Sequence, residues 1–359
     1  MAEHRAGTIR QSRAASNMFT RAEPAVPTRP RYESVTVTVP ARLHLGFLDL
    51  DGGLGRRFGG LGLTLDGPCT RLHMTRGGRP ASDGPDTARA RAFVERLAQH
   101  FRIDAEVSLS IDEAIPEHIG LGSGTQLALA AGIALCRLYG LDAGAREIAA
   151  ALGRGTRSGI GIGAFEQGGV LLDGGRGPAA EPPPIISRFP FPEPWRILLI
   201  ADARRRGRHG DDETEAFARL PPFGAETAGH LCRLMLMAAL PALAEEDLDG
   251  FGAAVTELQR VVGDYFAPFQ EGGRYSSPLM AEVLAWLESE GVAGVGQSSW
   301  GPTGFALVGS EDDAQELSHA ARRHWAAETR LTFAVRRGRN RGGEVAFDRA
   351  ARPAVERSA

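Results

Sequence analysis

The order of apolar and polar positions divides the chain into alternating strand-like and helix-like segments. Residues 35–39 (Val-Thr-Val-Thr-Val) and 105–111 alternate with a period of two, as half-buried strands do. Residues 126–139 form a long, alanine-rich apolar helix that Gly140 is placed to end. The same patterns predict strands at 170–172, 195–200 and 331–335, and helices at 89–101, 143–152, 225–244, 247–262 and 278–290. Because strands and helices mix without a regular βαβ alternation, we expect an α+β fold.

A proline-rich stretch predicts the boundary between two domains. Glu181 is followed by three prolines, and further prolines stand at 190, 192 and 194. We expect a disordered tail at 1–32, an N-terminal domain at 33–182, a C-terminal domain at 190–337 and a flexible tail at 338–359. A length of 359 residues fits two domains. The first 30 residues lack the apolar region of a secretory signal.

The charged residues exclude several classes of chemistry. The 41 basic residues are balanced by 44 acidic ones, for a net charge of −3, so no broad basic field favours nucleic acid or an anionic membrane. All 41 basic residues are arginine, which excludes lysine Schiff bases, lysine general bases and a Walker-type loop. The three cysteines (69, 136 and 232) lie far apart, which favours neither zinc nor disulfides and fits the reducing cytoplasm.

A glycine-rich loop stands directly before the long apolar helix. Gly120, Gly122, Ser123, Gly124 and Thr125 allow a ligand to approach the backbone, and the first amides of the helix would face that ligand. This arrangement predicts an anion site. The alternative is a turn in which Ser123 or Thr125 simply caps the helix.

Three motifs, taken in order, resemble the GHMP small-molecule kinase superfamily. Residues 116–123 match the pattern of its phosphate loop, P-x-x-x-G-L-G-S. Residues 39–46 (VPARLHLG) resemble its opening strand, and residues 294–307 (GVGQSSWGPTGFAL) resemble its C-terminal glycine-rich motif. The resemblance implies a two-domain GHMP-kinase-like fold, with an N-terminal domain like domain 2 of ribosomal protein S5 and a ferredoxin-like C-terminal domain.

The departures from the kinase pattern disfavour phosphoryl transfer. Gly161 stands where these kinases carry an aspartate that contacts the acceptor hydroxyl, and Gly124 replaces the second serine of the loop. A glycine can neither orient a hydroxyl nor stabilise phosphoryl charge. Glu166 is the only nearby acid that could substitute for the missing aspartate.

One branch of the superfamily is more similar. Residues 42–65, 155–175 and 294–307 resemble β-ribofuranosylaminobenzene 5′-phosphate synthase, a family of methanopterin biosynthesis. The resemblance implies a cytoplasmic transferase that condenses phosphoribosyl pyrophosphate with 4-hydroxybenzoate or 4-aminobenzoate and releases CO2 and pyrophosphate. It implies Mg²⁺ as well, with ligands that the sequence does not identify. A GHMP-type kinase using ATP and a non-catalytic binding protein of the same fold remain as alternatives.

Candidate site residues follow from this chemistry. Asp49 and Arg56 are seven positions apart in a glycine-rich turn and are either a catalytic pair or a structural one. Glu166 is a third catalytic candidate. Phosphate or pyrophosphate would bind at Gly120, Gly122, Ser123, Gly124 and Thr125, and at a second nest of Thr156, Arg157 and Ser158, unless the latter is a plain loop. The substrate pocket would include Arg42, His44, Gln297, Ser298, Ser299 and Trp300.

Each pocket residue also has an alternative interpretation. His44, like Arg42 before it on the strand, can belong to the core, and Trp300 can fill the domain junction instead of stacking on an aromatic acid. Arg208 or His209 could face a phosphate, or could lie in a solvated loop. We expect small-molecule substrates and no nucleic acid or membrane partner. We also expect a homodimer, for which Leu231 to Leu243 offers an apolar helix.

Overall fold

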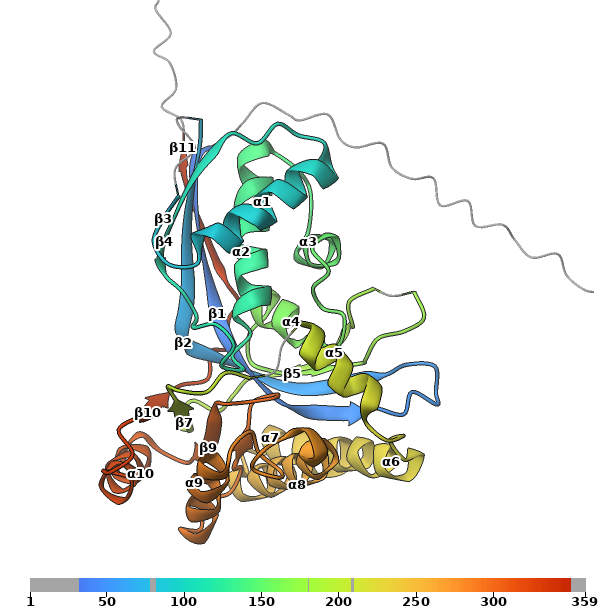
Figure 1. The fold of residues 1–359 in the computed structure, drawn as a ribbon, viewed down its shortest axis with the longest axis vertical. Coiled ribbons are helices and arrows are strands. Elements are labelled where there is room, and N and C mark those ends of the chain that lie inside the picture. The colour runs from blue at the N-terminus through green and yellow to red at the C-terminus, as the bar shows by residue number, and fades with distance from the viewer. Residues whose placement is uncertain (1–31, 78–81, 180, 208–209, 350–359) are drawn as a thin grey trace, which may run out of the picture.

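A long antiparallel hairpin of β1 (Tyr32–Asp49) and β2 (Phe58–Arg76) runs through both halves of the molecule (Figure 1). The computed structural model describes residues 32–77, 82–179, 181–207 and 210–349; the tail expected at 1–32 lies outside them except for Tyr32. Alternation of apolar residues predicted only 35–39 of β1 as a strand, and the resemblance extended it to residue 46. From Val39 to Leu50 nearly every residue is buried, so the strand shows no alternation there.

The N-terminal half is a seven-stranded sheet with helices packed on one face (Figure 1). Its main strand order is β11-β1-β2-β4-β3; β5 pairs with the first part of β2, and β6 pairs with β5. The remaining strands are β3 (Ser82–Asp83), β4 (Val107–Glu113), β5 (Val170–Asp173), β6 (Ile185–Phe189) and β11 (Glu344–Arg349). The helices are α1 (Thr87–Phe101), α2 (Ser123–Tyr139), α3 (Ala145–Ala151) and α4 (Ile160–Glu166).

The C-terminal half is a four-stranded antiparallel sheet with its own helices. Its strands are β7 (Arg196–Asp202), β8 (Gly296–Gln297), β9 (Gly304–Val308) and β10 (Leu331–Arg336). The order β10-β7-β9-β8, with helices between β7 and β8 and between β9 and β10, is the expected ferredoxin-like arrangement. The helical segments are α5 (Gly210–Arg219), α6 (Ala225–Leu234), the π-helix η1 (Met235–Ala239), α7 (Leu240–Ala244), α8 (Leu248–Phe266), the 3₁₀ turn η2 (Ala267–Phe269), α9 (Pro278–Ser289) and α10 (Glu311–His324). The α+β class is confirmed.

The helical segment 225–244 is the one stretch of the described residues that is long and apolar enough to cross a membrane. It packs against β1 and α8. Leu231, Met235 and Leu243 are fully or almost fully buried by these contacts. Of its most apolar window 33% is buried within the chain, and a core helix meets the same criterion of length and composition.

The prediction of a flexible tail over 338–359 is wrong for residues 344–349. These residues form β11, which pairs antiparallel with β1 and sets Val345 opposite Val37 and Phe347 opposite Val35. The arginine and glycine content of this region obscured the short apolar alternation of Val345 and Phe347. The predicted linker likewise contains a strand, β6. Residues 350–359 lie outside the described part of the chain.

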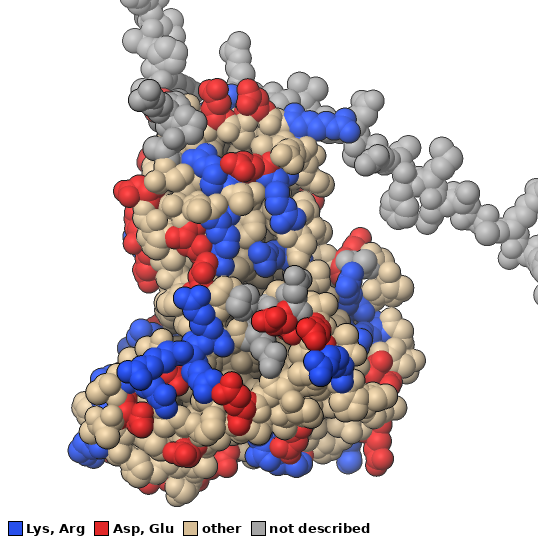
Figure 2. Space-filling view, viewed as in Figure 1, with Lys and Arg blue, Asp and Glu red and all other residues tan. Residues whose placement is uncertain are grey.

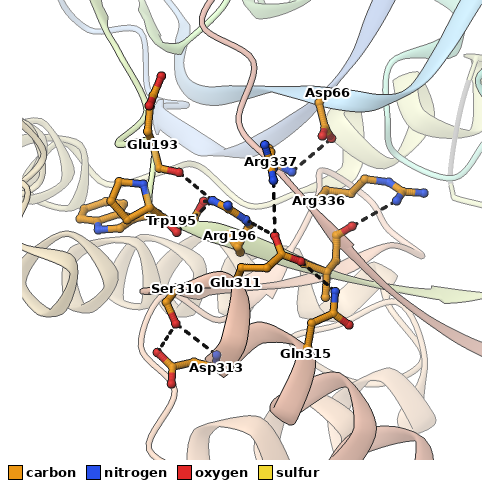
Figure 3. Close-up of polar contacts among 12 residues, drawn as sticks. Asp66, Glu193, Trp195, Arg196, Ser310, Glu311, Asp313, Gln315, Arg336 and Arg337 are labelled. Atoms are coloured by element: carbon orange, nitrogen blue, oxygen red, sulfur yellow. Dashed lines mark hydrogen bonds and ion pairs between the residues drawn. The ribbon is translucent and has the colours of Figure 1, made fainter.

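A polar cluster ties the two halves together beside the start of β7 (Figure 3). The Arg196 guanidinium donates to the Glu311 carboxylate at 2.5 Å and to the carbonyl oxygens of three residues before β7. The Arg337 amide donates to Asp66, at the end of the apolar part of β2. These contacts fix β2, β7 and α10 relative to one another, and so they set the position of the two glycine-rich motifs.

Candidate functional site

The glycine-rich loop before α2 is held to β1 and to the C-terminal motif through its carbonyl oxygens. The Gly120 oxygen accepts from Arg42 Nη1 at 2.6 Å and from Ser298 Oγ at 2.8 Å. The Leu121 oxygen accepts from the Arg42 amide at 3.2 Å. A Cβ on Gly120 would lie 2.6 Å from the Ser298 oxygen, so the close approach of the two motifs requires glycine at this position. The glycine-rich loop and the C-terminal motif at 294–307 therefore pack together.

The rest of the loop follows the same pattern. The His118 oxygen accepts from the Gly207 amide, and the Ile119 oxygen accepts from the Thr303 hydroxyl, both at 2.6 Å. The carbonyl groups of 118–121 are thus engaged by the protein, whereas the amides of residues 120–124 donate no hydrogen bond to another described residue and remain for a ligand. This is the arrangement of an anion-binding nest.

The start of α2 strengthens this interpretation. Gly122 precedes the helix with φ +85° and has no side chain to cap it. The amides of Thr125 and Gln126 both turn back to the Gly122 oxygen. Neither the Ser123 nor the Thr125 hydroxyl caps the helix. The alternative of a side-chain-capped turn is therefore wrong, and the first amides of α2 are free of side-chain acceptors.

Arg42 brings a positive charge directly to this loop. Its guanidinium packs on Gly122, where a Cβ would lie 3.1 Å from the Arg42 Cζ. Burial lowers the pKa of Arg42 to about 10, which still keeps the group protonated at neutral pH. Its Nε is buried and has no hydrogen-bond partner among the described residues. Arg42 is thus a buried cation of the loop itself.

His44 is a buried neutral histidine. It is only 3% exposed, and burial, reinforced by the nearby Arg42 charge, lowers its pKa to about 3. Its Nε2 lies against Gly60, where a Cβ would be 3.0 Å away. A histidine that stays neutral at physiological pH cannot act as a cationic acid. Its backbone, however, links the motifs, because the His44 amide donates to Ser298 Oγ and its oxygen accepts from the Ser299 amide.

Asp173, at the end of β5, was not predicted as part of the site. It is 1% exposed, and its carboxylate accepts hydrogen bonds from the Ser158 hydroxyl and from the amides of Gly159 and Gly175. Burial raises its pKa to about 6 against these bonds, which favour the ionised form. Because Ser158 also accepts from the Ile160 amide, it serves the start of α4. The predicted second phosphate nest at 156–158 therefore has its serine engaged within the protein.

Arg157, from the same segment, forms an ion pair with Glu213 on α5. The Arg157 Nη1 lies 2.8 Å from a Glu213 carboxylate oxygen, and its Nη2 donates to Thr214. Glu213 lies beside the Trp300 indole and within electrostatic reach of Arg42, and burial raises its pKa. Glu213 follows an arginine-rich run at 204–209, and no signal in the sequence selected it as a site residue. Arg208 and His209, from that run, lie outside the described residues.

Trp300 fills the junction between the halves. It is 3% exposed, stacks on Phe266 with ring centroids 4.1 Å apart, and meets the edge of Phe217. Trp300 was expected either to stack on an aromatic substrate or to fill the domain junction. Its burial and its ring contacts are those of a residue that fills the junction. The preceding Gln297 is also engaged, with its side chain bonded to Gln270 and to the Ser276 amide. These predicted pocket residues hold the C-terminal motif in place.

The expected pair of Asp49 and Arg56 does not form. Asp49 accepts from the amides of Asp51 and Gly52 and so shapes the β1–β2 turn. Arg56 donates to the carbonyl oxygens of Gly174 and Gly175 at 2.6 and 2.5 Å. Among the described residues neither side chain is bonded to the loop at 120–125. The spacing of Asp49 and Arg56 in a glycine-rich turn did not predict the hydrogen-bond partner of either side chain. In the structure both side chains bond to backbone groups.

Gly161 itself, and not an acid, lies beside the loop, and no hydrogen bond or ion pair of the described residues joins Glu166 to the loop. Gly161 lies in the first turn of α4 against Thr125, where a Cβ would be 3.0 Å from the Thr125 Cγ2. Glu166 is the last residue of α4, where Gly342 packs against its backbone. The position beside the loop is thus occupied by a glycine, and a larger side chain there would require Thr125 to shift.

A further arginine at the loop was not singled out from sequence. Arg154, between α3 and α4, places its Nη1 3.3 Å from the position of a Cβ on Gly124. Nothing but its location between two glycines marks it in the sequence. Arginines, the only basic residues of this chain, run down the upper half toward the junction on the face in Figure 2. No group of three or more His, Cys, Asp or Glu side chains among the described residues could hold a metal ion.

Comparison with known proteins agrees with this geometry. The family model described as GHMP kinases N terminal domain matches residues 88–169, and the one described as GHMP kinases C terminal matches residues 239–327. Solved structures with the same fold include a homoserine kinase from Cytophaga hutchinsonii, with a TM-score of 0.61, 18% identity and coverage of 89% of this chain and 100% of that one. Mevalonate diphosphate decarboxylase from Staphylococcus aureus gives a TM-score of 0.59 and 13% identity over 88% of this chain and 98% of its own. The fold is that of the GHMP superfamily.

Closer relatives narrow this class. The β-ribofuranosylphenol 5′-phosphate synthase of Archaeoglobus fulgidus is 33% identical over 324 residues, which are 85% of this chain and 97% of that protein. The protein of the same name from Methanothermobacter thermautotrophicus is 31% identical over 294 residues, 76% of this chain and 88% of its own. The chain belongs to the β-ribofuranosylphenol 5′-phosphate synthase family, and is therefore a member of a family of transferase enzymes.

Proposed function

We propose that this protein transfers the phosphoribosyl group of phosphoribosyl pyrophosphate to the carboxyl-bearing ring carbon of 4-hydroxybenzoate or 4-aminobenzoate. The bond between the ribose C1 and the pyrophosphate oxygen breaks, and its electron pair leaves with pyrophosphate. The ring carbon forms the new bond to C1. The carboxylate then leaves as CO2, and the electron pair of the broken bond restores the aromatic ring. Atoms and charge balance without an oxidant, a reductant or an added proton.

The observation that carries this proposal is a phosphate loop next to Gly161. The loop offers N–H groups at 120–124 together with the buried Arg42 cation, which suit a leaving pyrophosphate. The position beside Thr125 holds no carboxylate to accept a proton from an alcohol. The same loop can therefore bind a polyphosphate without supporting phosphoryl transfer to a hydroxyl.

We propose that the Glu213 carboxylate stabilises the positive charge that develops on the ribosyl group. This carboxylate lies within electrostatic reach of Arg42 and is paired with Arg157, on the side of the loop where the two halves meet. Preorganised charge in a water-poor site is the strongest common means of stabilising a charged transition state. Asp49 and Glu166, the acids favoured by sequence, have no comparable contact with the loop.

Mg²⁺ enters this proposal only as a counter-ion of the pyrophosphate donor. Mg²⁺ in such sites is usually held by the substrate phosphates together with one or two carboxylates, and the described residues contain no group of three or more His, Cys, Asp or Glu side chains. The acidic side chains nearest the loop, Glu117 and Glu213, are each paired with an arginine. We therefore derive no step through a metal ion.

The test is release of labelled CO2 from each carboxyl-labelled benzoate, with and without phosphoribosyl pyrophosphate. We expect CO2 and pyrophosphate in equal amounts, dependent on both substrates. The names of the relatives make 4-hydroxybenzoate the first acceptor to try. Formation of ADP from ATP and an alcohol would point to a kinase instead, and the absence of any turnover would point to a binding protein. A role in cytoplasmic methanopterin biosynthesis is part of the same proposal.

A further inference from the structure

Arg154 is a cation at the phosphate loop with no internal partner. Its Nε is buried without a hydrogen-bond acceptor, and it forms no ion pair in the described part of the chain. The guanidinium lies over the face of Phe93, 5.1 Å from the ring centroid. Burial lowers the pKa of Arg154, and the charges of Arg89 and Arg96 lower it further. A desolvated cation repelled by two others is unfavourable in the free protein, because a buried charge normally has a partner.

The neighbouring acids do not neutralise this charge. Asp86 and Glu117 are the carboxylates nearest this group of arginines, and both form ion pairs with Arg89. Arg96 is exposed and without an ion pair among the described residues. The region around the start of α2 therefore has positive charge in excess, next to helix amides that are themselves partly positive.

Gly124 explains why Arg154 can reach the loop. A Cβ at position 124 would lie 3.3 Å from Arg154 Nη1, tighter than an ordinary contact. In the kinase pattern this position is a serine, whose hydroxyl would occupy the space. Here the side chain is absent, and the guanidinium lies against Gly124 in the first turn of the helix. Arg42 packs on Gly122, so two guanidinium groups lie against the same short stretch of backbone.

We propose that Arg154 takes over the role of the missing serine and donates to the diphosphate group of the bound donor. This inference rests on the proposed function for the identity of the donor, and it adds the residue that makes the loop selective for a diphosphate over a single phosphate. A guanidinium presents parallel N–H donors to phosphate oxygens and carries a full charge, whereas a serine hydroxyl offers one neutral donor.

The test measures binding of inorganic pyrophosphate and of inorganic phosphate by calorimetry to the full-length protein and its Arg154→Ala variant. We expect the variant to raise the pyrophosphate Kd by ~10–100-fold, the loss of one charge-assisted contact, with a smaller change for phosphate. Without ligand, the variant should melt at the wild-type temperature or higher, because it removes an unpaired, repelled cation. A purely structural arginine would give the opposite change in melting temperature.

Two further variants complete the design. Gly124→Ser should displace the guanidinium and raise the pyrophosphate Kd in the same direction. Arg323→Ala, which removes an exposed arginine on α10, is the matched control and should leave the Kd unchanged. An Arg154→Ala variant with the wild-type pyrophosphate Kd, or a wild-type protein that does not bind pyrophosphate, overturns the inference. If the variant loses pyrophosphate binding while no benzoate releases CO2, the inference holds and the proposed function fails.

Discussion

Arg157 and Glu213 form a 2.8 Å ion pair that joins the segment before α4 to helix α5 of the other half. The Glu213 carboxylate of this pair is the one that we propose to stabilise the positive charge on the ribosyl group. Since Arg157 also contacts Thr214 and the face of Phe217, it holds α5 against the N-terminal half. The pair thus links substrate chemistry to the contact between the halves.

Glu213→Gln should lower kcat by about 100–1000-fold, the scale of losing one preorganised electrostatic contact in the transition state. The KM for phosphoribosyl pyrophosphate should change little, because the positive charge on the ribose develops only as pyrophosphate leaves. Steady-state kinetics in both substrates measures this split. Asp212→Asn, an exposed neighbour on α5, is the matched control. Unchanged kcat in Glu213→Gln would remove Glu213 from the chemistry.

Arg42→Ala should raise the KM for phosphoribosyl pyrophosphate by about 10–100-fold. The substitution removes both the buried charge and the bond that holds the Gly120 oxygen. Arg56→Ala serves as the comparison, because Arg56 binds backbone oxygens of the 174–175 turn away from the loop. We expect its donor KM to match that of the wild type. Equal effects of the two variants would contradict our assignment of the site.

Gly161→Asp tests whether the absent acid alone separates this protein from a kinase. We expect no ADP formation from ATP with alcohol acceptors, and a loss of stability of about 1–3 kcal/mol from overpacking against Thr125. Thermal denaturation and a coupled ADP assay measure the two quantities. Gly153→Asp, at an exposed turn where a Cβ meets nothing within 4 Å, controls for the added charge, although its φ of +66° adds strain of its own. Robust ADP formation would show that the loop is competent for phosphoryl transfer.

The buried His44 predicts how stability depends on pH. Its pKa is about 3 in the folded protein and near 6.5 when unfolded, so between these values the unfolded chain binds one more proton. The stability that His44 contributes by staying neutral is complete above pH 6.5 and is lost as pH falls toward 3. Relative to His44→Gln, the wild type should lose about 1.4 kcal/mol of unfolding free energy per pH unit below pH 6. Parallel urea titrations between pH 7 and 4.5 measure the difference; parallel curves would contradict it.

An exposed apolar pair on η1 bears on the expected homodimer. Leu236 and Met237 are 65% and 68% exposed, while Leu231, Met235 and Leu243 of the same segment are buried within the chain. If two copies associate, this pair supplies exposed apolar surface, since the large apolar side chains of Leu231, Met235 and Leu243 are packed within the chain. Leu236→Glu should then convert a dimer into a monomer in light scattering at micromolar concentration. A wild-type monomer would rule the dimer out.

The loop and its neighbours were predictable because their requirements are local. Gly120, Gly122 and Gly124 before an apolar helix predict an anion site, since close backbone approach and helix amides depend on a few consecutive residues. The two motifs that pack on the loop were recognisable as a set, and the α+β class followed from the periodicity of the strands and helices. The absence of lysine and the glycine at position 161 already disfavoured a kinase.

The partners of charged side chains were not predictable. Asp49 and Arg56 lay close in sequence, but each turned to backbone groups, whereas Arg154 and Glu213 lay far from the loop in sequence and reach its surroundings only through folding. Strand β11 was missed because it is stabilised by pairing with β1, which lies more than 300 residues away in the sequence.

The sequence by itself determined where a glycine-rich turn of the GHMP pattern lies, what class of fold carries it and which chemistry lysine cannot perform here. Only the tertiary structure decided which arginines and which carboxylate face that turn. The physical reason is that a turn is set by the backbone preferences of neighbouring residues, whereas the environment of a charge is set by whatever the fold packs around it. The basic residues of this chain are all arginine, so residue type does not distinguish them. Their packing does, because Arg42 and Arg154 lie at the glycine-rich loop, whereas Arg56 bonds the backbone of the 174–175 turn.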